Sequence, residues 1–174
     1  MARSAGTATA RPGVEWVQGD MLDAGSLERA VQGVQAVIHL ACATGVANES
    51  LARRVNVDGT RALLDAAQRH GARRFVFVST ISATRERMGP YGRTKREGEA
   101  MVAHAGLDWV IVRPSLVYGS APVGLFATLA GYLRSLPVVP VIGSGKLELD
   151  PIHVDDVCEV LVQCVSRADV VGKT

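Results

Sequence analysis

The stretch RFVFVST, residues 74–80, decides the fold class. Its centre is continuously apolar rather than alternating, as a strand buried on both faces requires. Two other runs share this character: AVIHLA at 36–41 and DWVIVRPS at 108–115, which ends at Pro114. Strands of this kind occur in parallel sheets whose two faces are covered by helices.

Helical segments alternate with these runs. SLERAVQGV at 26–34 has apolar residues at helical spacing, with Asp23 or Ser26 as its N-cap. The segments at 56–71 and 91–106 consist mostly of good helix formers, and each ends in glycine. The alternation predicts a doubly wound α/β domain with a parallel sheet.

The sheet prediction can be stated residue by residue. A further short run, VEWVQGD at 14–20, predicts an additional strand. We expect strands near 14–18, 36–41, 74–79 and 109–113. We expect these side chains to be buried: Val37, Ile38, Leu40, Phe75, Phe77, Val110 and Ile111.

Composition limits the possible functions. The 174 residues suffice for one domain with a core, and the net charge of +2 argues against nucleic acid as a partner. The longest apolar stretch, 124–143, is interrupted by Arg134, Pro137 and Pro140, so it should not span a membrane. Its first half predicts an amphipathic helix that packs on the domain or on a partner.

The cysteines indicate a reducing compartment. Cys42, Cys158 and Cys164 form no CxxC motif and leave an odd thiol, and each lies in an apolar run. No secretory signal is visible at the N-terminus. We therefore expect buried, reduced thiols in a cytoplasmic protein.

Polar residues gather at the ends of the predicted strands. Asp20, Ser79, Thr80 and Ser115 all lie there, and in such sheets ligands bind at the carboxyl edge. YGRTK at 91–95 places a tyrosine one helical turn before a lysine, on one face of a helix. By itself such a pair can also be an ordinary surface pair.

The chain resembles the extended and atypical short-chain dehydrogenase/reductases of the NAD-dependent epimerase/dehydratase group. It looks most like an atypical branch that includes the accessory subunit of respiratory complex I. The resemblance runs from about Arg3 to the end. It rests on motifs in family order: GDMLD, AVIHLA, NVDGTRALLDAA, RFVFVST, YGRTK, VRPSLVYG and PIHVDDV.

The resemblance implies NAD or NADP as the cofactor and a catalytic set of Thr80, Tyr91 and Lys95. Thr80 would orient the substrate oxygen, and Tyr91 would move the proton during hydride transfer. The Lys95 ammonium would lower the tyrosine pKa from about 10 and could bind the nicotinamide ribose. The implied cofactor contacts are Asp20 and Met21 beside adenine, Leu40 and Ala41 beside the ribose and phosphates, Pro114, Ser115 and Val117 beside the nicotinamide, and Tyr91 and Lys95.

A second function remains open at this point. Atypical family members can keep the Tyr–Lys pair, bind the cofactor and catalyse nothing. The protein would then be an NAD(P)-binding scaffold or redox sensor that binds a partner protein. The shortened loop between Thr80 and Tyr91 and the apolar stretch 124–143 favour this alternative.

Other polar residues have structural explanations. Asp155 and Asp156 precede a helical pattern with Glu159 in the right place for a capping box, so we interpret them as a helix cap. His153 lies in the same turn and is expected to fix structure. His39 lies in a predicted buried strand without metal-ligating partners, so we predict no metal site.

The chain departs from the family pattern at both ends. Nothing supplies the strand and GxxGxxG turn that bind the pyrophosphate, because the early glycines are Gly6 and Gly13. GKT at 172–174 resembles the lead into a further strand. We therefore expect one partial Rossmann-like NAD(P)-binding domain over 1–174, incomplete at both ends, with the substrate-binding part starting at about 120–150.

The departures also affect the ligands. Arg3 would pair with a 2′-phosphate and favour NADP, unless it is only a disordered terminal residue. Leu149 stands where nucleotide-sugar enzymes often carry an arginine, so a nucleotide sugar is in doubt within the wider class of carbonyl or hydroxyl compounds. Without a pyrophosphate turn, we expect these 174 residues alone to bind NAD(P) weakly or not at all and to leave the middle of the sheet uncovered.

Overall fold

A parallel three-stranded sheet forms the centre of the molecule. The computed structural model describes residues 12–44, 48–119, 124–135 and 150–174. The strands lie in the order β1-β2-β3, with Val37 opposite Phe75 and Phe77 opposite Ile111. The strand bounds are β1 Ala36–His39, β2 Arg74–Val78 and β3 Asp108–Val112. The predicted α/β class with a parallel sheet is confirmed.

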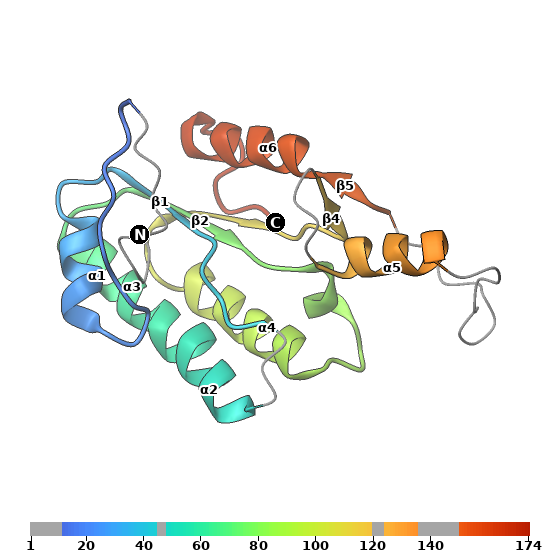
Figure 1. The fold of residues 1–174 in the computed structure, drawn as a ribbon. Coiled ribbons are helices and arrows are strands. Elements are labelled where there is room, and N and C mark those ends of the chain that lie inside the picture. The colour runs from blue at the N-terminus through green and yellow to red at the C-terminus, as the bar shows by residue number, and fades with distance from the viewer. Residues whose placement is uncertain (1–11, 45–47, 120–123, 136–149) are drawn as a thin grey trace.

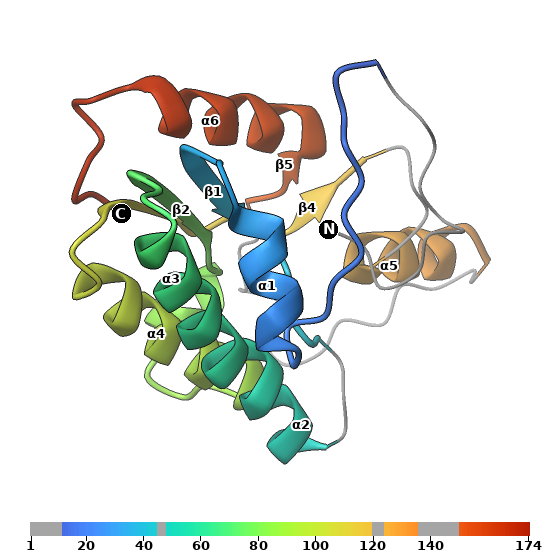
Figure 2. The ribbon, with the colours of Figure 1, turned by 90° about the vertical axis from the view of Figure 1, so that its left-hand side faces the viewer.

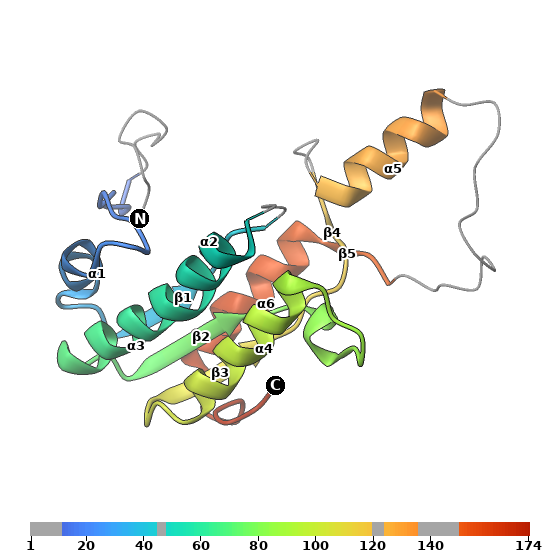
Figure 3. The ribbon, with the colours of Figure 1, turned by 90° about the horizontal axis from the view of Figure 1, so that it is seen from below.

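Helices cover both faces of this sheet. Helices α1, α3 and α4 lie against one face and α6 against the other, as Figures 1 and 2 show. Seen from below, α3 and α4 run side by side along the sheet (Figure 3). The bounds are α1 Ala24–Val31, α3 Gly59–Arg69, α4 Pro90–Ala103 and α6 Val154–Ser166.

Shorter elements complete the described chain. Helix α2 runs through a π-helical turn, η2, directly into α3, so the predicted helix at 56–71 begins earlier than expected. A 3₁₀-helix, η3, follows β2, and α5 lies beside a small parallel pair formed by β4 and β5. The bounds are α2 Glu49–Arg53, η2 Arg54–Asp58, η3 Ile81–Thr84, β4 Val117–Tyr118, α5 Gly124–Ser135 and β5 Ile152–His153.

Each face of the sheet has its own core. Phe75, Phe77 and Ile111 are buried in the cluster under α1, α3 and α4. Val76 and Val110 point the other way, into the smaller cluster that α6 covers. The continuous apolar run of β2 thus fills two cores, and full burial of each large side chain contributes about 1.5–3 kcal/mol.

The helix boundaries agree with the sequence signals at several points. Asp23 is the N-cap residue of α1, although its side chain makes no capping hydrogen bond. Gly71 and Gly106 follow α3 and α4 with φ of 76° and 69°, the left-handed conformation that glycine adopts without strain. Lys173 forms an isolated parallel bridge with Val110, so the residues at 172–174 do reach the sheet.

Two predictions about the sheet are wrong. Residues 14–17 form no strand, and Gln18 makes only an isolated bridge. Ile38 is 37% exposed, Leu40 is 58% exposed and Val37 is only partly buried, whereas all three were expected to be buried. The physical reason is that β1 is an edge strand, with no strand on its outer side in the described part of the chain.

The remaining segments bring smaller corrections. Cys164 is buried, but Cys42 is only partly buried and Cys158 is exposed, and all are free thiols. The N-cap of α6 is His153, whose Nδ1 accepts the N–H of Asp155 at 3.3 Å. Asp155 and Asp156 therefore lie in the first helical turn, where carboxylates favour the helix dipole.

The expected helix in the first half of 124–143 is present as α5, and its Leu129, Tyr132 and Leu133 are exposed. Residues 136–149, and with them Leu149, lie outside the described ranges. No helix among the described residues is long and apolar enough to cross a membrane.

His39 is a neutral histidine inside the larger core. Its Nε2 lies 2.9 Å from Thr60 Oγ1, and Thr60 donates its own proton to the Asn56 carbonyl at 2.7 Å. Nε2 must therefore carry the proton, which fixes the tautomer. Burial, with a smaller contribution from the Lys95 ammonium, lowers the pKa of His39 to about 3.

Gly98 provides the first testable prediction. A Cβ at Gly98 would lie 2.7 Å from Cζ of the fully buried Phe77 ring, whereas a Cβ at Gly131 in α5 would meet nothing. Gly98→Ala should lower the free energy of unfolding by about 1–2 kcal/mol, because overpacking exceeds the gain in helix propensity. The control, Gly131→Ala, should raise it by up to about 1 kcal/mol. Urea unfolding measures both, and equal effects would contradict the close packing of α4 on β2.

The buried His39 leads to a second testable prediction, on the pH dependence of stability. Its pKa is lowered from 6.5 to about 3, so between these pH values the unfolded chain binds a proton that the folded chain does not. The free energy of unfolding should therefore fall as pH drops through this window, by up to about 1.4 kcal/mol per pH unit. His39→Gln should make this slope shallower, whereas His104→Gln, at an exposed position, should not. An unchanged slope in His39→Gln would exclude a neutral, buried His39.

Candidate functional site

Thr80 lies where β2 ends, between two hydrogen bonds that continue the sheet. Ser79 N–H donates to the Val112 carbonyl at 2.7 Å, and Ile81 N–H donates to the Pro114 carbonyl at 3.1 Å. These bonds bring the segments after β2 and β3 together, so the predicted site residues Thr80 and Pro114 are neighbours.

The Thr80 hydroxyl keeps a proton to offer. Its Oγ1 accepts the N–H of Ser82 at 3.2 Å, which starts η3. In the part of the chain that the structure describes, no acceptor takes the hydroxyl proton. A ligand oxygen at this edge of the sheet could accept it, as expected of a residue that orients a substrate.

Helix α4 brings Tyr91 and Lys95 to the same place. A Cβ at Gly92 would lie 2.9 Å from the Ser82 carbonyl oxygen, so this glycine lets the start of α4 approach η3 closely. Tyr91 and Lys95 are one turn apart on α4 and share a face. The structure thus brings the predicted catalytic residues to the carboxyl end of β2.

Lys95 is a buried cation. Its side chain is 2% exposed, and Nζ lies 4.1 Å from the centroid of the Phe77 ring. Burial lowers the pKa of Lys95 to about 8, while the nearby Cys42 and Glu99 act to raise it. The side chain is therefore covered, and a hydrogen bond from Nζ to a cofactor ribose would require the surrounding residues to move.

The expected lowering of the Tyr91 pKa is wrong. Burial, and then the adjacent Cys42 thiol, raise the pKa of Tyr91 to about 12. Burial disfavours the charged phenolate form of the half-buried Tyr91 hydroxyl, which is the larger of these causes. Tyr91 consequently holds its proton at neutral pH and can donate it, rather than act as a phenolate base.

Asn56 is a structural member of the site that sequence reasoning missed. Its amide lies in the π-helical turn η2 and is 2% exposed. Oδ1 accepts the N–H of Ala43 at 2.7 Å, and Nδ2 donates to the Ala43 carbonyl at 3.1 Å and to Thr94 Oγ1 at 3.0 Å. It thereby ties the segment after β1 to α4. The signal was a polar residue inside an otherwise apolar helical pattern, in a π-turn of the kind often found at functional sites.

Glu99 and Arg113 were also missed. Arg113, directly after β3, forms paired contacts of 2.9 and 2.8 Å with the Glu99 carboxylate on α4. Glu99 is only 6% exposed. A glutamate one turn after the lysine in a helix that faces the sheet could have suggested such a pair.

The predicted adenine and ribose contacts lie along the carboxyl end of β1. Met21, Leu40 and Ala41 line one groove of about 310 Å³, together with His39 and mostly apolar neighbours. Met21 is buried against Gly59, whose added Cβ would lie 2.9 Å from the Met21 carbonyl oxygen. The structure thus brings these three predicted residues together around one groove.

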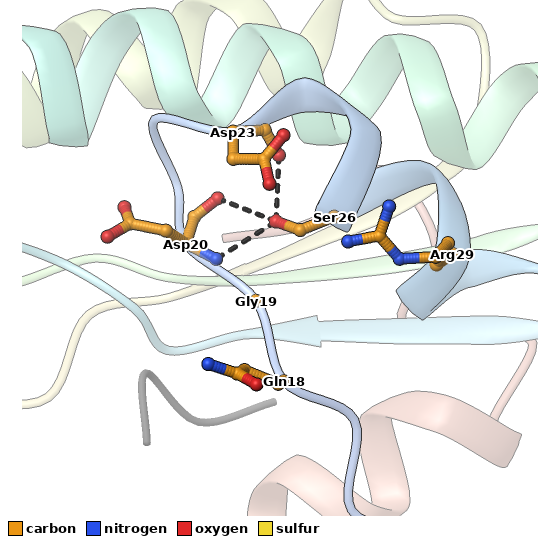
Figure 4. Close-up of a pocket in the computed structure, with 6 residues that line it drawn as sticks. All are labelled: Gln18, Gly19, Asp20, Asp23, Ser26 and Arg29. Carbon is orange, nitrogen blue, oxygen red and sulfur yellow. Dashed lines mark hydrogen bonds between the residues drawn. The ribbon is translucent and has the colours of Figure 1, made fainter. Parts of the chain in front are cut away.

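Asp20 borders a second, polar cavity of about 470 Å³ with Gln18, Gly19, Asp23, Ser26 and Arg29. The Ser26 hydroxyl accepts the Asp20 N–H and lies within hydrogen-bond distance of the Asp20 and Asp23 carbonyl oxygens (Figure 4). These bonds hold one wall of the cavity together. The Asp20 carboxylate points away from Arg29 and accepts the N–H of Leu22 at 2.9 Å.

The remaining predicted contacts lie apart from this cavity. The Ser115 hydroxyl donates to the Asp150 carbonyl, and Val117 pairs with Ile152 in the β4–β5 sheet. Val117 therefore belongs to the small sheet, whereas Ser115 lies in the segment between Pro114 and β4. Arg3 lies outside the described residues. The described ranges hold no group of metal-ligating side chains.

The chain is similar in sequence to known NAD(P)H-binding proteins. Residues 1–168 match a family described as NAD(P)H-binding. The chain is 37% identical over 162 residues to a ceramide reductase of Caulobacter vibrioides, covering 91% of this chain and 49% of that protein. It is 30% identical over 164 residues to NADH dehydrogenase (ubiquinone) 1 alpha subcomplex subunit 9 of Mus musculus, covering 92% of this chain and 42% of that protein.

A solved structure agrees with the sequence relatives. The dTDP-glucose 4,6-dehydratase of Streptomyces venezuelae, solved with NAD bound, superposes with a TM-score of 0.76 at 28% identity, over 94% of this chain and 58% of that one. The chain spans about half the length of the curated relatives it matches. The chain belongs to the NAD(P)H-binding family, in the group of the extended short-chain dehydrogenases, epimerases and dehydratases.

Proposed function

We propose that the whole protein is an NAD(P)-dependent oxidoreductase or epimerase of the short-chain dehydrogenase type, with Thr80, Tyr91 and Lys95 at its active site. The observation that carries the proposal is the buried Lys95 ammonium beside the hydroxyl-bearing ends of β2 and α4. Burying a cation is costly, so such a group outside an exposed ion pair suggests a functional site.

The residues present fit two parts of a nicotinamide dinucleotide. The groove at Met21, Leu40 and Ala41 offers apolar walls for an adenosine half, and Asp20 supplies a carboxylate near it. Thr80 and Tyr91 offer hydroxyl groups near Pro114, where the nicotinamide half would lie. When bound, the cofactor would supply or accept a hydride. The preference for NADP through Arg3 stays a prediction.

Tyr91 and Thr80 have distinct roles in this proposal. The Thr80 hydroxyl proton would be donated to a carbonyl oxygen and hold it in place. Tyr91, with its pKa raised to about 12, would give its proton to the same oxygen as the carbonyl becomes an alcohol. The protonated tyrosine therefore favours the reductive direction of the reaction.

The substrate class is broader than one compound. The relatives and neighbours include a ceramide reductase and a dTDP-glucose dehydratase, so a carbonyl or hydroxyl group on a larger molecule is the shared feature. A nucleotide sugar is one such class. The substrate-binding part would begin at about 120–150, which includes α5 with its exposed Leu129 and Leu133. The cytoplasmic location also stays a prediction.

A scaffold function is the second candidate. It is favoured by the coverage of Lys95, because a hydrogen bond from Nζ to a cofactor ribose would require the surrounding residues to move. The similarity to a subunit of a mitochondrial NADH dehydrogenase supports it as well. Tight NADPH binding without oxidation by a panel of carbonyl compounds and sugar nucleotides would favour the scaffold.

Substitution of Tyr91 tests the enzyme. In the whole protein, Tyr91→Phe should lower turnover about 10²- to 10⁴-fold, because the proton donor is lost. NADPH affinity should stay nearly intact, because the hydroxyl is the only group removed. Turnover is followed as NADPH oxidation with a carbonyl panel, and affinity by calorimetry.

Thr80→Val should also slow turnover. Its matched control is Thr84→Val, which removes an exposed hydroxyl at the far end of η3. Unchanged turnover in Tyr91→Phe would remove this tyrosine from the mechanism, and equal losses in the two threonine variants would remove Thr80.

A further inference from the structure

The Lys95 ammonium lies over the face of the Phe77 ring. Nζ lies 4.1 Å from the ring centroid, and Phe77 is fully buried beneath it. This arrangement depends on Gly98, because any Cβ at that position would collide with the same ring. The aromatic face attracts a cation, and more strongly where water is excluded.

An aromatic ring alone does not balance a buried charge. A desolvated ammonium tends to release its proton unless an anion or several acceptors face it. Burial lowers the pKa of Lys95 to about 8, and Cys42 and Glu99 oppose that effect. Glu99, which is paired with Arg113, is thus the nearby carboxylate whose charge acts on Lys95.

Glu99 is held in a fixed position. It follows Lys95 by one helical turn, so the two side chains lie on the same face of α4. Both carboxylate oxygens accept hydrogen bonds from the Arg113 guanidinium, at 2.9 and 2.8 Å. A paired contact of this kind fixes orientation as well as charge.

The Glu99 carboxylate stays ionised in its buried place. Burial acts to raise its pKa, but Arg113, Ser79 and Lys95 outweigh burial, and the net pKa is lowered. Ser79 Oγ is buried without a hydrogen-bond partner among the described residues, and it lies close enough to the carboxylate to act on it.

Charged and titratable groups face Lys95 from each element packed around it. His39 of β1 is neutral, and Cys42 follows the same strand. Tyr91 lies one turn before on α4 and keeps its proton. Arg113 contacts the Glu99 carboxylate on α4.

We propose that Glu99, locked in place by Arg113, is a positioning residue that keeps Lys95 protonated on the Phe77 ring. It does not touch the reacting atoms, and it acts through Lys95. The charge effect is a property of the folded chain, whereas its consequence for catalysis rests on the proposed function.

The experiment reads the Lys95 charge directly. The sequence has three lysines, Lys95, Lys146 and Lys173, so lysine labelled with ¹³C at Cε gives few signals. The Cε shift is followed against pH in the 174-residue chain. Glu99→Gln should lower the Lys95 titration midpoint by about 1 pH unit, because it removes a buried opposite charge one helical turn away.

Glu97→Gln is the matched control. It removes a carboxylate from the same helix, but Glu97 is more exposed and pairs with Arg53 at 2.6 Å. The Lys95 midpoint should not move in this variant. Equal midpoints in folded Glu99→Gln and in Glu97→Gln would overturn the proposal.

Two measurements keep the test decisive if Glu99→Gln does not fold. The unaltered chain should show a Lys95 midpoint near 8, and Glu99→Asp, which retains the carboxylate, should stay close to that value. A midpoint below 7 in the unaltered chain would overturn the proposal. None of these readouts uses a substrate, so absence of turnover in the whole protein would count against the proposed function alone.

Discussion

The burial of the Lys95 ammonium between α4 and the sheet is the constraint on which the rest of the site depends. Lys95 is nearly inaccessible to water and rests on a core phenylalanine. Glycine at 98 lets α4 lie close against β2, and the nearby Glu99 carboxylate acts to raise the pKa of Lys95 against the effect of burial. A buried charge without such compensation would shed its proton or destabilise the fold.

The same packing links the core to the edge of the sheet. Phe77 belongs to the core under α4, and its ring also contacts the Lys95 ammonium. A change in core packing would therefore alter the surroundings of Lys95. Asn56 holds the segment after β1 against α4, and the hydrogen bonds on either side of Thr80 hold the segment after β3. Three strand ends therefore meet where the hydroxyl groups lie, as in other parallel sheets that bind ligands at this edge.

Much of this arrangement could be predicted from the sequence, because it rests on local pattern. The apolar runs predicted the parallel sheet, and the one-turn spacing predicted that Tyr91 and Lys95 share a face. What could not be predicted depends on long-range contacts. Ile38 and Leu40 were expected to be buried because strand character alone does not tell which strand lies at an edge. The raised pKa of Tyr91 and the Glu99–Arg113 pair likewise depend on side chains brought together only by folding.

The most direct test of the central claim, that the proposed chemistry depends on the buried Lys95 charge, is the pH dependence of the carbonyl reduction proposed for the whole protein. Lys95 loses its proton near pH 8, and Tyr91 keeps its proton to about pH 12. The rate at subsaturating substrate should therefore be level below about pH 8 and then fall with the loss of one proton. A rate that stays level through pH 10 would contradict the account.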